Sequence, residues 1–160
     1  MAPPPSMAVS PLVALIVRIV TFGGLLISVI VLATTTGFNE SYAFRYMLAS
    51  GVIGMAYTIL QTALTLFYLS TGNRLGGDGF AFLDFFGDKV ISYMLATGAA
   101  AGFGLSVDLA RLLQAQGNFN STAESFLQKA NVSASLLFIG FLFSAISSVF
   151  SSLSLPKRVD

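Results

Sequence analysis

The chain has 160 residues, of which 55% are hydrophobic and only 9% are charged. An average soluble domain carries about 25% charged residues, so this composition predicts an integral membrane protein. The net charge of +1 gives no basic patch for nucleic acid, and the absence of His and Cys excludes disulfides, zinc held by Cys or His, and catalysis by a Ser–His or Cys–His pair.

The N-terminal segment, residues 1–11, reads MAPPPSMAVSP, and we expect a disordered tail because proline interrupts helices. An apolar run then covers residues 12–33, which is long enough for a helix that crosses a membrane. The run is longer than the core of a typical signal peptide, and no basic region precedes it. We therefore expect a retained first span, although it contains Arg18.

Three further stretches are apolar enough to cross a membrane, at about residues 44–69, 82–107 and 132–155. Together the four spans predict an all-α integral membrane four-helix bundle. It forms one domain over residues 12–155, and residues 156–160 form a short tail. Residues 108–116 are able to extend the third helix beyond the bilayer, with Gly117 as its stop.

Arg18 raises the question of how a permanent charge is tolerated in an apolar span. It lies six residues into its span, or about 9 Å deep at about 1.5 Å per residue. Asp88 lies at a matching depth in the third span, which crosses in the same direction. An aspartate in hydrocarbon needs a cation, a hydrogen bond or a proton, so we predict an Arg18–Asp88 ion pair. The alternative is that Arg18 snorkels to the headgroups, with Asp84 and Lys89 marking the interface.

Small residues and serines favour close helix packing in the third and fourth spans. Gly98 and Gly102 have the four-residue spacing that lets helix backbones approach, and Ser144 and Ser148 lie in the fourth span. Packing within one chain is the default interpretation. Contact between chains through these faces is the functional alternative.

The second span contains a polar pair, Tyr57 and Gln61, which are four residues apart. Residues at this spacing are neighbours on one helix face. Gln61 lies near the middle of the membrane, where we expect it to bond a neighbouring helix.

The orientation of the bundle rests on two triplets, because Lys and Arg are almost evenly divided between the two sides. The triplets NES at Asn39 and NST at Asn120 fit the N-glycosylation pattern and fall in loops on the same side. A third triplet at Asn131 adjoins the predicted fourth helix, and we expect it to lie too close to the membrane for use. These sites predict that both chain ends are cytoplasmic.

Three stretches resemble helices of a known family. VRIVTFGGLLISVIVLATTTG looks like its first helix, and FFGDKVISYMLATGAAAGFG resembles its third, an aspartate leading into an alanine- and glycine-rich helix. ANVSASLLFIGFLFSAISSVFSSLSLPKR is similar to its fourth. The family is the plant Casparian strip membrane domain proteins and their CASP-like relatives, which are similar to MARVEL-type four-helix proteins.

The resemblance implies a plasma-membrane protein that has cytoplasmic ends and assembles into homo- and heteromers. It also implies that the family's intramembrane arginine and aspartate correspond to Arg18 and Asp88. The Casparian members form a platform that organises local cell-wall modification, but this chain lacks their first-loop signature and the cysteines of their second outer loop. The expectation is therefore a CASP-like relative.

The most favoured function is a non-catalytic, self-associating plasma-membrane scaffold, a glycoprotein that organises cell-wall modification or membrane subdomains. Its expected partners are further copies, related membrane proteins and the lipid bilayer, with no nucleic acid and no cofactor. The alternative is a small transporter or channel with a polar path lined by Arg18, Asp88 and Gln61. A membrane enzyme with a metal held by Asp78, Asp84 and Asp88 is the third reading, and no further ligands support it.

Overall fold

The computed structural model describes residues 10–35, 40–72 and 77–153, apart from the side chains of residues 77, 78, 80 and 81. Within these ranges the protein is all-helical. The four helices are α1 (Pro11–Ala33), α2 (Tyr42–Thr71), α3 (Gly77–Ala115) and α4 (Ser121–Leu153). Each is long and apolar enough to cross a membrane, which confirms the predicted fold class. The expectations for the tail before Ser10 and for residues 156–160 lie outside the described residues.

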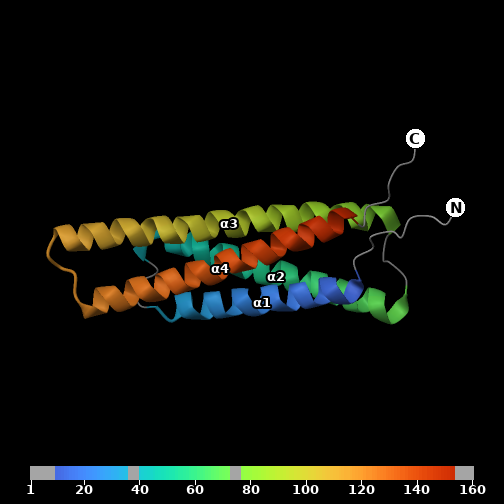
Figure 1. Ribbon diagram of the computed structural model, residues 1–160, viewed down its shortest axis with the longest axis horizontal. Coiled ribbons are helices and arrows are strands. Elements are labelled where there is room, and N and C mark those ends of the chain that lie inside the picture. The colour runs from blue at the N-terminus through green and yellow to red at the C-terminus, as the bar shows by residue number, and fades with distance from the viewer. Residues whose placement is uncertain (1–9, 36–39, 73–76, 154–160) are drawn as a thin grey trace.

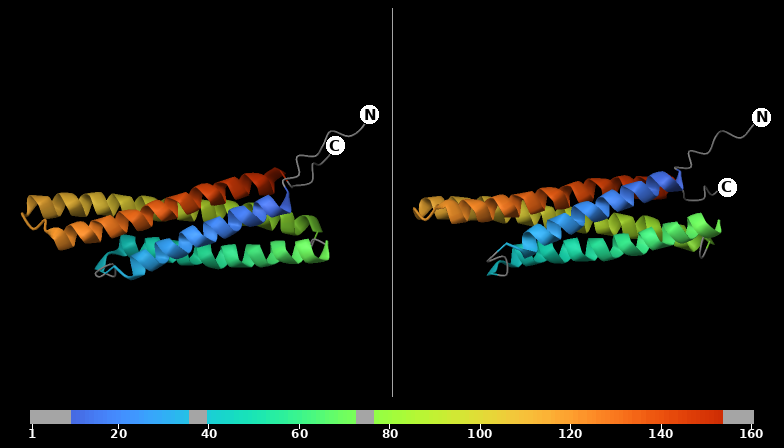
Figure 2. Two further views of the ribbon diagram at one scale, coloured as in Figure 1. Left: turned by 60° about the horizontal axis from the view of Figure 1, so that its bottom comes forward. Right: turned by 90° about the horizontal axis from the view of Figure 1, so that it is seen from below.

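The helices form an elongated bundle in which consecutive helices run in opposite directions (Figure 1). Each of α1 and α3 packs against both α2 and α4, so the chain passes around the bundle in sequence order. The start of α1 and the end of α4 consequently lie at the same end of the bundle (Figures 1 and 2). Because α1 and α3 run in the same direction, residues that are equally far from the starts of their membrane spans lie at the same level in the bundle.

The helices α3 and α4 project well beyond α1 and α2 at the opposite end of the bundle (Figure 1). At about 1.5 Å per residue, the 23 residues of α1 span about 35 Å, whereas the 39 residues of α3 span about 58 Å. The third and fourth helices were expected from residues 82 and 132, but they begin at Gly77 and Ser121. Hydropathy marks only the part of a helix that fits the hydrocarbon core, and polar residues continue both helices beyond it.

Backbone-capping residues fix the helix ends near the loops. Gly72 and Gly117 have positive φ angles, of 69° and 67°, and they follow the ends of α2 and α3. Glycine adopts this left-handed conformation without steric cost, so both residues stop their helices. The role predicted for Gly117 is thus confirmed. At the start of α4, the Asn120 side chain accepts the Ala123 N–H at 2.9 Å.

The bundle interior combines leucines with small residues, and the exterior is apolar. Leu25, Leu95 and Leu137 come from three different helices and have no exposed surface. Gly54 lies against two of them, because a Cβ atom placed there would be 2.9 Å from Leu95 and 3.1 Å from Leu25. Large apolar side chains such as Ile16 face outward, as expected for a surface that contacts lipid.

Candidate functional site

A network of polar side chains lies inside the bundle and includes residues of all four helices. Its cation is Arg18 of α1, which is only 8% exposed. Arg18 Nη1 donates to the side-chain oxygen of Gln61 at 2.7 Å, to the Gln61 carbonyl at 2.9 Å and to Thr65 Oγ1 at 3.2 Å. These acceptors all belong to α2. The guanidinium therefore does not snorkel to the headgroups but turns into the bundle.

Asp88 of α3 is the buried carboxylate that faces Arg18. The closest approach between them is 3.8 Å, from Arg18 Nη2 to Asp88 Oδ2. Direct charge-assisted hydrogen bonds are usually about 2.7–2.9 Å long, so this ion pair is a looser contact. The carboxylate accepts shorter bonds from hydroxyl groups: Tyr57 at 2.8 Å, Ser151 at 2.8 Å and Ser147 at 3.2 Å. The structure thus brings the predicted pair together, and it adds donors from α2 and α4.

Gln61 connects the cation to the carboxylates. Its side-chain oxygen accepts from Arg18, while Nε2 donates to Tyr57 OH at 2.9 Å and to Asp84 Oδ1 at 2.8 Å. Every one of these contacts has the donor and acceptor pairing that a primary amide requires. The expectation that Gln61 bonds a neighbouring helix is met twice, on α1 and on α3. Asp84, which marks the interface in the alternative interpretation of Arg18, is a member of the network.

Arg18 and Asp88 carry opposite charges and face one another inside one chain. Buried ions are costly in a low-dielectric medium unless hydrogen bonds and opposite charges surround them. The described residues place Arg18 between Gln61 and Asp88, and three hydroxyl groups complete the Asp88 shell. The arrangement is suited to holding four helices in register.

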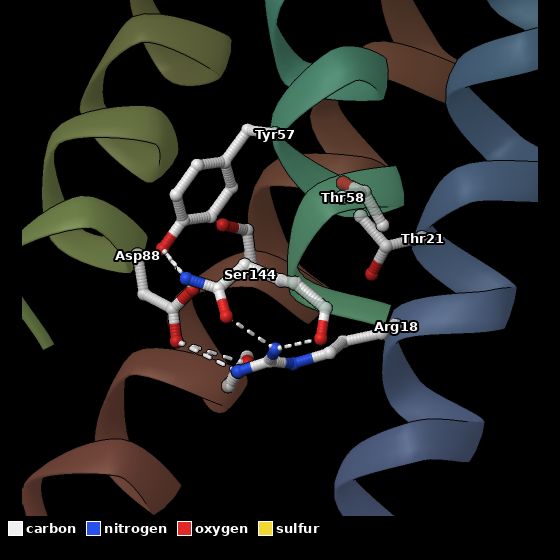
Figure 3. Close-up of a pocket in the computed structure, with 8 residues that line it drawn as sticks. Arg18, Thr21, Tyr57, Thr58, Asp88 and Ser144 are labelled. Atoms are coloured by element: carbon white, nitrogen blue, oxygen red, sulfur yellow. Dashed lines mark hydrogen bonds and ion pairs between the residues drawn. The ribbon is translucent and has the colours of Figure 1, made fainter. Parts of the chain in front are cut away.

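A small cavity lies within the network, with a volume of about 10 Å³. Side chains of all four helices line it, among them Arg18, Thr21, Thr58, Asp88 and Ser144 (Figure 3). This volume is close to the minimum that one water molecule needs. The cavity is therefore too small for an organic solute.

Gly98 and Gly102 face the inside of the bundle. A Cβ atom on Gly98 would meet Ser50 Oγ and would lie 3.1 Å from Leu137 Cδ2. A Cβ atom on Gly102 would meet Met47 Sδ. Both glycines therefore allow α3 to approach α2 and α4 of the same chain. The packing of this pair inside the chain agrees with the default interpretation, and it leaves little of the surface that contact between chains would need.

The fourth-helix serines also face inward. Ser144 and Ser148 are both buried, and Ser144 lines the small cavity. The face of α4 that carries both serines therefore packs inside the chain.

A second polar contact was missed in the sequence. Ser28 of α1 and Ser133 of α4 each donate a hydrogen bond to the other's backbone carbonyl, both at 2.8 Å. This reciprocal contact holds the two helices at close range in an otherwise apolar region. Ser28 is a single serine in an apolar stretch, Ser133 lies between Asn131 and Ser135, and no spacing signal links residues so far apart in the chain.

The possible glycosylation sites differ in their surroundings. Asn120 is exposed at the start of α4, and Asn39 lies outside the described residues. Asn131 was expected beside the beginning of the fourth helix, but it lies inside α4, because that helix begins at Ser121. It is exposed on the helix surface.

Comparison with known proteins gives a consistent family. The family model described as Casparian strip membrane protein domain matches residues 8–143. The chain is 50% identical to CASP-like protein 4D1 of Ricinus communis, over 99% of this chain and 100% of that protein. It is 47% identical to CASP-like protein 4D1 of Glycine max, over 97% and 94%, and 40% identical to CASP-like protein 4D2 of Arabidopsis thaliana, over 99% of each. No solved structure matches the chain.

Proposed function

The chain belongs to the Casparian strip membrane protein domain family, and on this basis we propose that it is a non-catalytic plasma-membrane protein that self-associates into a scaffold. In this proposal both chain ends are cytoplasmic. The assembled protein organises membrane subdomains or local cell-wall modification, and it includes related membrane proteins as well as further copies of this chain.

The observation that carries the proposal is the distribution of polar and apolar groups. Arg18, Gln61 and Asp88 are all at least nine-tenths buried and contact one another and nearby hydroxyl groups. The outer face of the helices is apolar, with side chains such as Leu60 and Val90 more than half exposed. A protein built in this way is suited to act through contacts with lipids and with other membrane proteins.

Self-association in this proposal uses the outer face of the bundle. Gly98 and Gly102 are occupied by contacts within the chain, so the contact between copies lies elsewhere. Apolar surfaces gain little from association in lipid unless their shapes fit closely. We therefore expect a modest affinity for each contact and an assembly that depends on protein density in the membrane.

The transporter alternative finds no support among the described residues. A polar path would need Arg18, Gln61 and Asp88 to face a continuous aqueous passage. Instead they bond one another around a cavity of about 10 Å³. A flux assay on reconstituted liposomes tests this alternative directly, and we expect no flux above that of empty liposomes.

The test of the scaffold proposal uses two differently tagged copies of the full chain in one plant cell. After crosslinking in the membrane and solubilisation in mild detergent, capture of one tag should recover the other, in species heavier than the 16.9 kDa monomer. An unrelated four-span plasma-membrane protein with the second tag serves as the control. Recovery of monomers alone, with and without crosslinking, would contradict self-association.

A further inference from the structure

The Arg18 guanidinium has a buried N–H group, at Nε, that lacks a hydrogen-bond partner among the described residues. Nη1 is bonded to α2 and Nη2 faces Asp88, but Nε is buried and contacts no acceptor among the described residues. Buried polar groups in folded proteins almost always have a partner, and a charged donor without one is especially costly. This N–H therefore indicates a hydrogen-bond acceptor that the protein chain itself does not supply.

Arg18 lines the cavity of about 10 Å³, together with two threonines that have spare acceptor capacity (Figure 3). Thr21 donates its hydroxyl proton to the Val17 carbonyl at 2.8 Å, and Thr58 donates its own to the Gly54 carbonyl at 2.7 Å. Both protons are thus committed to the residues' own helices. Each hydroxyl oxygen keeps a lone pair that is able to accept a hydrogen bond.

We infer that this cavity is a binding site for a single water molecule, which accepts the Arg18 Nε–H and donates to the oxygens of Thr21 and Thr58. Buried waters typically make about three hydrogen bonds, and these three groups supply one donor and two acceptors. The volume of about 10 Å³ is close to the minimum that one water needs. A metal cation is disfavoured because the Arg18 guanidinium itself lines the cavity. The inference does not depend on the proposed scaffold role.

The water has a specific structural consequence. Arg18 belongs to α1 and Thr58 to α2, so the molecule connects these two helices beside the direct Arg18–Gln61 bond. It also gives the Nε–H an acceptor, which lowers the cost of keeping a permanent charge in the bundle.

The test uses the full chain labelled with ¹⁵N-arginine in detergent micelles. Magnetisation transfer from water to the Arg18 Nε–H is measured in paired NOE and ROE experiments, in which opposite signs identify a long-lived bound water and equal signs identify chemical exchange. The resonance is assigned by its loss in Arg18→Lys, or by replacing the other arginines in turn if that variant does not fold. We expect transfer with opposite signs. Its absence in the wild-type protein would overturn the inference.

Two threonine variants test the proposed acceptors. The double variant Thr21→Val and Thr58→Val removes both oxygens at nearly constant volume and should abolish the transfer. Thr35 and Thr62 are matched controls, because each also donates to the carbonyl four residues earlier, at 2.7 Å, and neither lines the cavity. Thr35→Val and Thr62→Val should keep the transfer. Transfer that persists in the double variant, or that disappears in the controls, would overturn this site; if the double variant does not fold, the wild-type measurement decides.

Discussion

Arg18 Nη1 lies 2.7 Å from the side-chain oxygen of Gln61, whereas Arg18 Nη2 lies 3.8 Å from Asp88 Oδ2. A neutral amide on α2 is therefore a closer partner of the guanidinium than the carboxylate on α3. Gln61 also donates to Asp84 and to the Tyr57 hydroxyl, which in turn donates to Asp88, so the amide links the cation to both carboxylates. The stability of the bundle should accordingly depend on the amide as well as on the ion pair.

Gln61→Met should destabilise the bundle while keeping a similar side-chain volume. It removes one acceptor for Arg18 and the donors for Tyr57 and Asp84. Each buried group left unsatisfied costs about 1–3 kcal/mol, and more when the group is charged. The melting temperature in detergent measures the effect.

The exposed Gln114 of α3 provides the control for this change. Gln114→Met should leave the melting temperature unchanged. Equal melting temperatures for Gln61→Met and the wild type would show that the amide does not hold the network together.

Gly98→Ala should destabilise the folded chain. The added methyl group would meet Ser50 and Leu137, and overpacking of this kind typically costs about 1–3 kcal/mol. Gly104 is the matched control on the same helix, because a Cβ atom there meets nothing within 4 Å. Thermal melts should show a loss for Gly98→Ala and none for Gly104→Ala. Weakened crosslinking between copies, with an unchanged melting temperature, would instead show that Gly98 takes part in contact between chains.

Ser28→Ala and Ser133→Ala should each lower stability by removing one hydrogen bond between α1 and α4. Such bonds in membrane proteins contribute about 0.6 kcal/mol on average and up to about 1.7 kcal/mol. Ser135 is the control, because it is exposed and donates within α4 to the Asn131 carbonyl at 2.8 Å. Urea or SDS titration of the three variants measures the differences. A Ser135→Ala loss as large as the other two would remove the special role of the reciprocal pair.

The number of residues from the start of each span, multiplied by the helical rise, places Arg18 and Asp88 at one level. This works because the two helices cross the membrane in the same direction. The position of Gln61 near mid-membrane was also sufficient to predict a bond to another helix. The rotation of each helix about its axis is set by packing, which no single helix sequence encodes. That is why the intervening position of Gln61 and the participation of Asp84 and Thr65 were not predicted.

The small-residue spacing illustrates the same limit. Gly98 and Gly102 mark a face that permits close approach, but their spacing does not say which helix approaches. The packing of α2 and α4 decides it. The early start of α4 was missed for a different reason, because residues 121–131 are too polar to be recognised by hydropathy although they are helical.

The proposed topology predicts that protease added to intact cells spares tags at both chain ends. The reason is that both acceptor triplets, at Asn39 and Asn120, belong on the non-cytoplasmic side. Digestion of either tag would contradict this orientation.

Use of the Asn120 site is tested separately by Thr122→Ala. This change removes the acceptor triplet but keeps the Asn120 side chain that accepts the Ala123 N–H at 2.9 Å. It should abolish a shift in gel mobility that glycosidase treatment also removes, with no change in melting temperature. A mobility shift that is identical in Thr122→Ala would assign the modification to another site.

The central claim is that Arg18 is retained inside the bundle as a member of an internal clamp, and a double-mutant cycle with Asp88 tests it most directly. Arg18→Leu and Asp88→Leu should each lower the stability in detergent, because breaking a buried pair typically costs about 3–5 kcal/mol. The combined variant should recover much of the loss, since neither charge is then left uncompensated. Strictly additive losses of stability would contradict the account. They would show that Arg18 and Asp88 do not interact and would favour the alternative in which Arg18 snorkels to the headgroups.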